Sequence, residues 1–332
     1  MVSRPLVRRP PLGGSLVLAL GLLTLSAASA QPVGFTPVGL QGEALDNPTS
    51  LQFGPDGRLY VSQQMGTMFA FTIERTDPDA DGIGAYAATD VEAIDLVYRY
   101  TPNHDDDGTP NGTADRQVTG LLVTGTAANP VLYVTSSDSR IGGKPHGDVN
   151  LDTNSGVIHR LTCVGGISAT TGRCTAWEKV DLVRGLPRSE ENHAVNGMQL
   201  DAATNTLYLA IGGHTNAGGP SNNFAFITEF AYAAAVLSVD LDALDALPVQ
   251  TDTALYPGYT YRWVLDLPTL DDPTRPNVNG IDDPAQPGYD GRDPGDPFGG
   301  NDGLNQAKHL PGSPIQFFST GYRNIYDIVL TA

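Results

Sequence analysis

One strand–turn–strand unit occurs three times along the chain, and this repeat limits the fold more than any other feature. The second strand of each unit contains a Leu-Tyr-aliphatic tripeptide, at residues 59–61, 132–134 and 207–209, so the intervals are 73 and 75 residues. Apolar residues alternate on both sides of a polar turn, which is typical of β-hairpins. A repeat of this length predicts an all-β fold of the β-propeller type, in which each repeat forms one blade with long loops.

The third copy of the unit has a histidine at each end. Apolar residues alternate over 196–200 and 207–211, and a polar turn lies between them at 201–206. His193 precedes the first strand and His214 follows the second. Because the outer ends of two antiparallel strands lie together, we expect both histidines at the same end of the hairpin. Loops at the end of a rigid β scaffold commonly carry functional groups.

Three copies of the unit do not close a ring. A propeller takes at least four blades, and a further strand pattern at residues 322–330 has the form of an opening strand alone. We therefore expect residues 31–332 to form an incomplete propeller, the N-terminal portion of a larger protein. An acidic, Gly- and Pro-rich loop insertion is expected at 266–305.

The first thirty residues have the pattern of a secretory signal peptide. Three arginines precede the apolar run at 16–25, and the small residues at 28–30 form a cleavage site. We therefore expect a secreted protein, extracellular or periplasmic. No later stretch reaches the roughly 20 apolar residues that a membrane-spanning helix needs, so no span is expected after signal removal.

The exported chain is strongly acidic. Removal of the signal takes away three arginines and no acidic residue, which changes the formal net charge from −18 to −21. A surface of this charge repels nucleic acid and anionic lipid, so neither is expected as a partner. The charge suits a soluble exported protein or one that binds calcium.

The chain contains two cysteines, Cys163 and Cys174. In an oxidising compartment such a pair is expected to form a disulfide, here across a hairpin loop. A metal site at these cysteines is less consistent with the sequence, because a zinc site needs about four ligands and no CxxC or HxxxH partner motif exists.

Two acidic tracts supply candidate calcium ligands. The first has the spacing of the start of an EF-hand loop, but Ala88 stands where the bidentate carboxylate is required, which excludes a complete EF-hand. Calcium-stabilised loops and ordinary turns rich in Asp and Gly both remain open. The candidate ligands are Asp77, Asp79 and Asp81 in the first tract and Asp290, Asp293, Asp296 and Asp302 in the second.

Three segments resemble a known family, the soluble pyrroloquinoline-quinone (PQQ)-dependent glucose and sorbosone dehydrogenases, which are six-bladed β-propellers. The segments are DGRLYVSQQ at 56–64, LPRSEENHAVNGMQLDAATNTLYLAIGG at 186–213 and FFSTGYRNIYD at 317–327. Motifs of hydrolases, zinc proteases and nucleotide-binding proteins (GxSxG, HExxH, the Walker loop, GxGxxG) are absent from the exported chain.

The resemblance implies a site and a reaction. His193 would act as the general base on a hydroxyl of a sugar or other alcohol while a hydride passes to PQQ, which an external electron acceptor then reoxidises. A histidine titrates near neutral pH and suits this step. The cofactor would contact Gln63, Gln64, Asn192, Arg323 and Asn324. An arginine is suited to a quinone that bears carboxylates.

The sequence departs from the family pattern at three positions. Asn192 replaces an acid before the histidine, His214 replaces the aspartate after the glycines, and Ile325 replaces the proline after Arg-Asn. His193 is open to a second interpretation, as a loop histidine without a role. A second function is open too: a non-catalytic, calcium-ordered propeller module that binds carbohydrate or protein within a larger surface protein.

Overall fold

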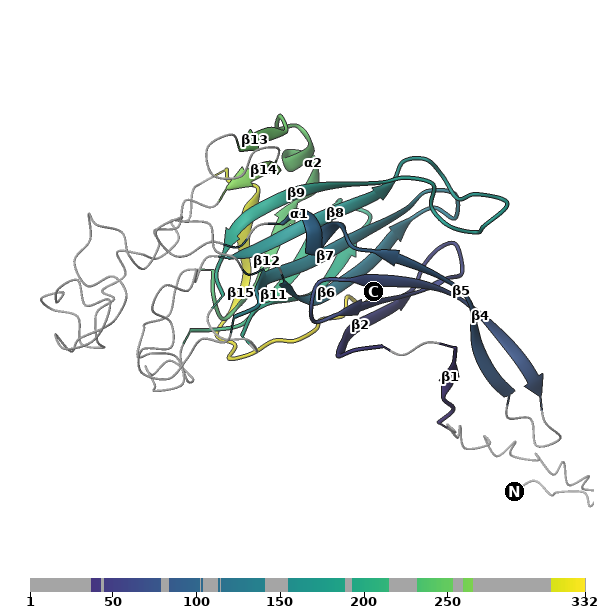
Figure 1. Cartoon of the computed structure of the whole chain (residues 1–332). Helices are drawn as coiled ribbons and strands as arrows, with labels where there is room; N and C mark the ends of the chain where they lie inside the picture. Colours follow the sequence, from purple (N-terminus) through teal and green to yellow (C-terminus); the bar gives the residue numbers. More distant parts are fainter. Residues whose placement is uncertain are drawn as a thin grey trace, which may run out of the picture. The chain divides into compact units, whose positions relative to one another are not determined.

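The computed structural model describes an almost wholly β chain with fifteen strands and two five-residue helices (Figure 1). The chain divides into two units, Met1–Pro37 and Val38–Ala332, and these elements all belong to the second. The expected all-β class is confirmed for the described part, whereas the signal peptide and the 266–305 insertion lie outside it. The described residues are 37–42, 45–78, 84–101, 103, 113, 115–140, 155–188, 193–214, 232–252, 259–264 and 312–331.

Sheet 1 is built mainly from the first copy of the repeat. Its order is β1-β5-β4-β3-β2, with antiparallel pairing from β2 to β5 and a parallel pairing between β1 and β5. Helix α1 (Leu96–Tyr100) follows β5. The strands are β1 (Leu40–Gln41), β2 (Pro48–Phe53), β3 (Leu59–Gln63), β4 (Met68–Pro78) and β5 (Gly84–Ile94).

Sheet 2 contains the second copy of the repeat and is extended at one edge. Its order is β13-β14-β9-β8-β7-β6, in which β6 to β9 form an antiparallel series and β14 pairs parallel with β9. The strands are β6 (Arg116–Gly125), β7 (Pro130–Asp138), β8 (Gly156–Cys163), β9 (Trp177–Leu186), β13 (Gln250–Asp252) and β14 (Tyr259–Val264).

Sheet 3 contains the third copy of the repeat. Its four strands are antiparallel neighbours in the order β10-β11-β12-β15, and helix α2 (Leu241–Asp245) follows β12. The strands are β10 (Val195–Asp201), β11 (Thr206–Ile211), β12 (Ala235–Asp240) and β15 (Ile315–Thr320). Each of the three sheets therefore contains four neighbouring antiparallel strands in chain order, although β13 and β14 of sheet 2 lie between β12 and β15 in the sequence.

The repeated tripeptides occupy equivalent strands. They lie in β3, β7 and β11, the second antiparallel strand of each sheet, as the period predicts. The predicted hairpin at 196–211 is confirmed by the pairing of β10 with β11. The strand predicted at 322–330 is wrong: these residues form no strand, and β15, which lies just before them, is the fourth strand of sheet 3.

Sheet 2 is apolar on both faces because each face packs against a neighbouring sheet. One buried cluster joins Tyr60, Met68 and Ala70 of sheet 1 to Leu132 and Leu161 of sheet 2. A second cluster joins the opposite face of sheet 2 to sheet 3, and it includes Ile158, Leu182, Leu209 and Leu237. Successive residues of a strand point to opposite faces, so a strand buried on both sides needs a continuous apolar run. In β6, Leu121 and Val123 belong to the first cluster and Leu122 to the second.

The first strands of the three antiparallel series, β2, β6 and β10, lie close together. Thr119 on β6 donates a hydrogen bond to the Val195 carbonyl on β10 (2.5 Å). A Cβ at Gly120 would lie 2.2 Å from the Asn196 carbonyl oxygen, so only glycine permits this approach. On the other side of β6, the Gln52 amide makes two hydrogen bonds to the backbone of Val123. Strands β2, β6 and β10 are thereby held side by side.

The predicted disulfide between Cys163 and Cys174 is confirmed, with a Cα–Cα distance of 5.8 Å. It closes the loop that joins β8 to β9. The loop is anchored on sheet 1, because the Cys174 N–H (3.2 Å) and the Trp177 indole N–H (2.8 Å) both donate to the Glu92 carboxylate. Glu92 also pairs with the buried Arg58.

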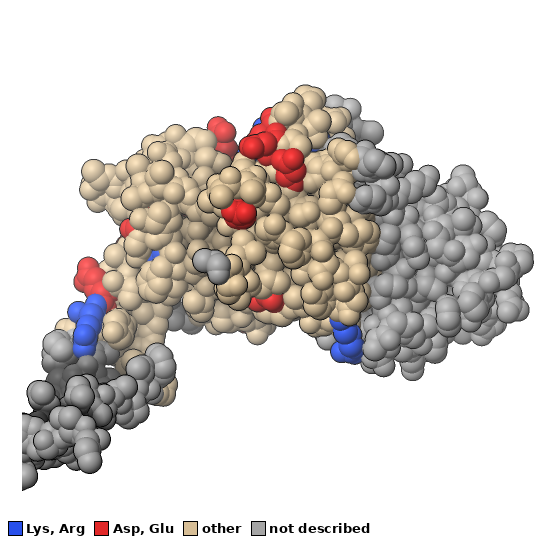
Figure 2. All heavy atoms as spheres, turned by 180° about the vertical axis from the view of Figure 1, so that it is seen from behind, with Lys and Arg blue, Asp and Glu red and all other residues tan. Residues whose placement is uncertain are grey.

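Charged side chains are sparse on the face shown in Figure 2, where acidic groups lie in several separate places among uncharged residues. Within the described segments, no helix combines the length and the apolar character needed to cross a membrane.

Candidate functional site

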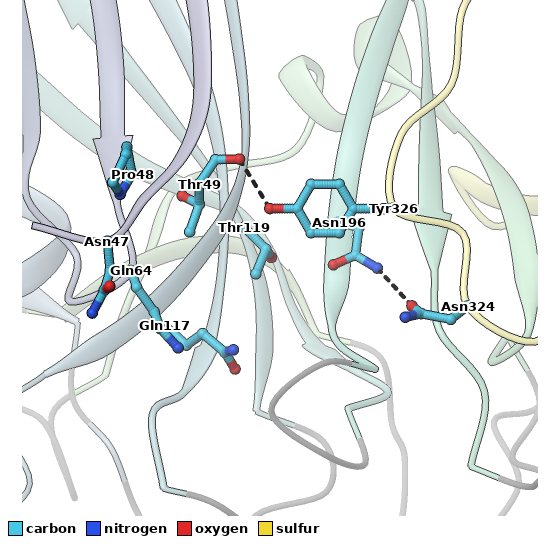
Figure 3. Close-up of a pocket in the computed structure, with 9 residues that line it drawn as sticks. All are labelled: Asn47, Pro48, Thr49, Gln64, Gln117, Thr119, Asn196, Asn324 and Tyr326. Atoms are coloured by element: carbon cyan, nitrogen blue, oxygen red, sulfur yellow. Dashed lines mark hydrogen bonds between the residues drawn. The ribbon is translucent and has the colours of Figure 1, made fainter.

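A pocket of about 370 Å³ lies where β2, β6 and β10 meet (Figure 3). The three strands come from three different sheets, so the pocket depends on the arrangement of the sheets and not on one hairpin. The described residues that line it are Asn47, Pro48, Thr49, Gln64, Gln117, Thr119, Asn196, Asn324 and Tyr326. Five of these nine side chains are carboxamides, two are threonines, and none carries a charge.

The pocket has a buried base and an exposed rim. Gln117, Thr119 and Asn196 are 4%, 6% and 1% exposed, because they lie on strands packed between sheets. The rim residues Asn324 and Tyr326 are exposed. Polar side chains fixed at the base of a concave site can orient a ligand, since little side-chain freedom remains to be lost on binding.

The segment that follows β15 closes one side of the pocket. The Tyr326 hydroxyl donates to the Thr49 carbonyl on β2 (2.9 Å). The Gly197 N–H donates to the Tyr326 carbonyl (2.9 Å), and the Asn196 amide donates to the Ile325 carbonyl (2.6 Å). A Cβ at Gly197 would lie 2.9 Å from the Tyr326 carbonyl oxygen and 3.0 Å from the Asp327 Cα, so a glycine is needed beneath the segment. These contacts fix the position of Tyr326 between sheets 1 and 3.

Two of the predicted cofactor residues line this pocket. Gln64 follows β3, and its backbone is held by hydrogen bonds to Asn47 and Val118 (both 3.0 Å). Asn324 lies on the segment after β15, 3.5 Å from the Asn196 amide (Figure 3). Gln63 is the last residue of β3 and is not among the described residues that line the pocket.

The other two described candidates are both hydrogen-bonded to Gly213, through different backbone groups of that residue. The His193 ring is 1% exposed, and its Nδ1–H donates to the Gly213 carbonyl (2.8 Å). The Gly213 N–H donates to the Arg323 carbonyl (2.9 Å). Arg323 is exposed and directly precedes Asn324 of the pocket. Gly213 thus links His193 to the segment that contains Arg323, and neither residue is among the described residues that line the pocket.

The hydrogen bond to Gly213 fixes the tautomer of His193. Because a carbonyl only accepts, the proton lies on Nδ1 and the lone pair lies on Nε2 in the neutral ring. A Cβ at Gly212 would lie 2.7 Å from the His193 Cα, so the chain after β11 must be glycine to pass this close. The roles predicted for these residues stay predictions.

The remaining predicted site residues cannot be placed. Asn192 and six of the seven aspartates lie outside the described residues, and the side chain of Asp77, near the end of β4, does too. The part of the chain that the structure describes contains no group of three or more His, Cys, Asp or Glu side chains arranged to hold a metal ion. The calcium sites therefore stay a prediction.

A buried polar chain in sheet 2 was not anticipated from the sequence. Ser136 Oγ lies 2.6 Å from Nε2 of His159, and Nδ1 of the same ring lies 2.5 Å from the Asp181 carboxylate. The three side chains come from the neighbouring strands β7, β8 and β9 and are fully buried. Arg116 donates to Ser136 (3.2 Å), and Lys179 donates to Asp181 (2.9 Å).

The hydrogen-bonded side chains of Ser136, His159 and Asp181 are connected as in a Ser-His-Asp triad, but they lie in the interior of sheet 2. Burial lowers the pKa of His159 to about 4, although Asp181 favours the protonated ring. The imidazole is therefore neutral at pH 7, donates from Nδ1 to Asp181 and accepts from Ser136 at Nε2. The three side chains join three neighbouring strands of sheet 2 and are fully buried, so these polar contacts stabilise the sheet. The only sequence signal for these contacts is the presence of polar residues inside apolar strands. The strand register that brings Ser136, His159 and Asp181 together cannot be inferred from single residues.

Comparison with known proteins shows distant and partial similarity. A calcium-containing structure of a Trichoderma reesei enzyme of Carbohydrate-Active Enzymes Family AA12 is 14% identical, with a TM-score of 0.36, over 67% of this chain and 41% of that one. The PQQ domain of pyranose dehydrogenase from Coprinopsis cinerea is 12% identical, with a TM-score of 0.32, over 66% and 36%. PQQ-bound aldose sugar dehydrogenase from Streptomyces coelicolor is 15% identical, with a TM-score of 0.31, over 65% and 50%.

This chain spans between 36% and 50% of the length of these three solved structures. No family model matches the chain, and no curated protein matches it.

Proposed function

We propose that this chain is part of an exported β-propeller that oxidises a hydroxyl group of a sugar or other alcohol, with PQQ as the hydride acceptor and an external electron acceptor. The propeller is supported by three successive sheets with the same four-strand order, stacked face to face. Blades of a propeller pack in this way, with the first strand of each blade at the axis. The pocket between β2, β6 and β10 would then lie at that axis.

The observation that carries the oxidoreductase proposal is the link that Gly213 makes between the His193 ring and the segment that contains Arg323 and Asn324. The His193 ring donates to the Gly213 carbonyl, and the Gly213 N–H donates to the Arg323 carbonyl. The next residue, Asn324, lines the pocket. His193 and Arg323 are 130 positions apart in the sequence. A base, a cation and an amide beside one pocket are the groups that a quinone-dependent alcohol oxidation needs.

The hydrogen-bonding groups and the positive charge of these residues suit PQQ. The Gln64 and Asn324 amides can hydrogen-bond to quinone carbonyl oxygens, and the guanidinium of Arg323 can pair with a carboxylate. A bound quinone would supply the hydride acceptor. His193 would remove the hydroxyl proton at Nε2, because Nδ1 carries the proton that is donated to Gly213.

Dye reduction tests this proposal. The full chain would be incubated with PQQ and calcium, and reduction of an artificial electron acceptor would be followed with aldoses as substrates. His193→Asn keeps a donor for the Gly213 carbonyl but removes the base, and we expect at least a hundredfold loss of rate. Gln63→Ala is the matched control for Gln64→Ala, since both are amides at the end of β3 but only Gln64 lines the pocket. Unchanged activity in His193→Asn would refute the assigned base.

A second candidate function is a non-catalytic module that binds carbohydrate. The observation that favours it is the uncharged lining of the pocket, since none of the nine described residues there is cationic. Saccharide binding without dye reduction under any loading condition would support this candidate over the enzyme.

A further inference from the structure

We propose that a second hollow between β2, β6 and β10 binds the primary ammonium group of a small organic cation, and that the Asp327 carboxylate recognises it. This hollow has a volume of about 320 Å³. Tyr326 and Thr49, which are joined by a hydrogen bond, line both this hollow and the pocket of Figure 3. The inference goes beyond the proposed function, because it requires neither PQQ nor turnover.

Asp327 is the only charged residue among those that are described in the lining of the hollow. Its carboxylate lies over Gly197 of β10, where a side chain would meet it, and one of its oxygens accepts from the Ile328 N–H (2.8 Å). The ion pairs of the described residues do not include Asp327. Its negative charge is therefore available to a ligand.

The hydroxyl hydrogens of Thr119 and Tyr326 are already used inside the protein. Thr119 donates to the Val195 carbonyl (2.5 Å), and Tyr326 donates to the Thr49 carbonyl (2.9 Å). The Gly197 N–H likewise donates to the Tyr326 carbonyl (2.9 Å). These groups offer oxygen lone pairs to a ligand but no hydrogen. A ligand must therefore supply the hydrogens, and an ammonium group brings three of them together with a positive charge.

The ring of Tyr326 adds a second attraction for a cation. Burial raises the pKa of the Tyr326 phenol, and the negative charge of Asp327 raises it further, which shows that this charge lies close to the ring. A cation that approaches the carboxylate can also contact the face of the aromatic ring. Pro48 and Leu51 of β2 provide apolar surface for an alkyl chain.

An organic cation suits the hollow better than a metal ion. Calcium takes about six to eight oxygen ligands, usually with several carboxylates, whereas the described residues hold no group of three or more His, Cys, Asp or Glu side chains that could bind a metal. The volume lies near the lower end of the roughly 300–1,000 Å³ range of small-molecule sites, which suits a short alkylammonium. The net charge of −18 also concentrates cations near the protein.

Saturation-transfer NMR of the full chain without PQQ tests the inference with butylammonium as the probe. We expect an affinity on the order of 1 mM that weakens as salt is added, and at least fivefold weaker binding of 1-butanol, the neutral molecule of the same length. Asp327→Asn keeps an acceptor for the Ile328 N–H and removes the charge, so butylammonium should bind about fivefold more weakly, as for one partly exposed ion pair. Glu178→Gln is the matched control, because it changes the net charge equally at an exposed residue of β9 outside the hollow.

Leu51 offers a second pair of variants, which keeps the test valid if Asp327→Asn alters the segment around it. The Leu51 side chain is 66% exposed, so its replacement costs little packing. Leu51→Lys places an ammonium group at the hollow and should abolish butylammonium binding, whereas Leu51→Gln should leave the affinity within about twofold.

The outcomes separate this inference from the proposed function, since dye reduction plays no part in the measurements. Butylammonium binding that Asp327→Asn and Leu51→Lys weaken, and that Glu178→Gln does not, would support the ammonium site whether or not the protein oxidises sugars. Equal binding of 1-butanol would overturn it, as would butylammonium binding that neither hollow variant weakens. Calcium that displaces butylammonium at equal concentration would show a metal site and would overturn the assignment too.

Discussion

The neutral state of His159 predicts a specific loss of stability in mild acid. The folded protein holds this imidazole inside sheet 2 with a pKa of about 4, whereas the unfolded chain has the ordinary value of 6.5. Between these two pH values the unfolded state binds a proton that the folded state does not bind. The free energy of unfolding therefore falls as the pH decreases from 6.5 to 4, and below pH 4 this contribution changes no further.

The magnitude follows from the two pKa values. Each unit of difference corresponds to about 1.36 kcal/mol, so the contribution lost is about 2 kcal/mol at pH 5 and about 3 kcal/mol at pH 4. This is a large fraction of the roughly 5–15 kcal/mol by which a domain is stable. Although burial opposes it, hydrogen bonding to Arg140 lowers the pKa of the Asp138 carboxyl in the folded protein. The stability that this carboxyl contributes is lost only below pH 3.8, the pKa of the group in the unfolded chain.

His159→Gln removes the titration and keeps most of the hydrogen bonding. The glutamine amide can donate to Asp181 and accept from Ser136, as the neutral imidazole does. Urea unfolding of both proteins, followed by far-UV circular dichroism at half-unit steps from pH 7 to pH 4, gives the difference in unfolding free energy. Wild type should be the more stable at pH 7, and its advantage should shrink by about 3 kcal/mol at pH 4. A difference that does not change with pH would refute a depressed pKa at His159.

Three further changes test the packing around the site. Gly120→Ala should lower the free energy of unfolding by about 1–3 kcal/mol in denaturant titrations, because its methyl group would meet the Asn196 carbonyl; an unchanged midpoint would contradict the close approach of β6 and β10. Replacement of Cys163 and Cys174 by alanine should cost about 3 kcal/mol in the same assay, and a loss below about 1 kcal/mol would show that the loop is held by its contacts to Glu92 instead. Tyr326→Phe should speed hydrogen exchange at residues 322–328 while leaving the three sheets protected, since it removes the hydrogen bond to Thr49.

The strands were largely predictable because their signal is local. Alternation of apolar residues and the repeated tripeptide are read within a few positions, and they located β3, β7, β11 and the hairpin of β10 with β11. The prediction of a strand at 322–330 failed because these residues bond to β10 and β2 through single contacts and not through a continuous ladder. Local pattern does not reveal which partner a segment will find.

The site was predictable only in part, since its residues come from different sheets. The family motifs singled out Gln64 and Asn324, which line the pocket. Gln117 lies outside the three motifs, and Asn196 lies within the 186–213 segment without a predicted role, because a single amide in an apolar strand gives no functional signal until the sheets are placed side by side. The buried chain from Ser136 to Asp181 was missed for the same reason: its residues meet only through the register of three strands.

A crystal structure of the full chain with glucose bound tests the central claim most directly. The account predicts one sugar between β2, β6 and β10, within hydrogen-bond distance of Gln117 or Asn196 and against the Tyr326 ring. A sugar bound elsewhere on the protein would contradict it, as would a structure in which β2, β6 and β10 do not surround a common pocket.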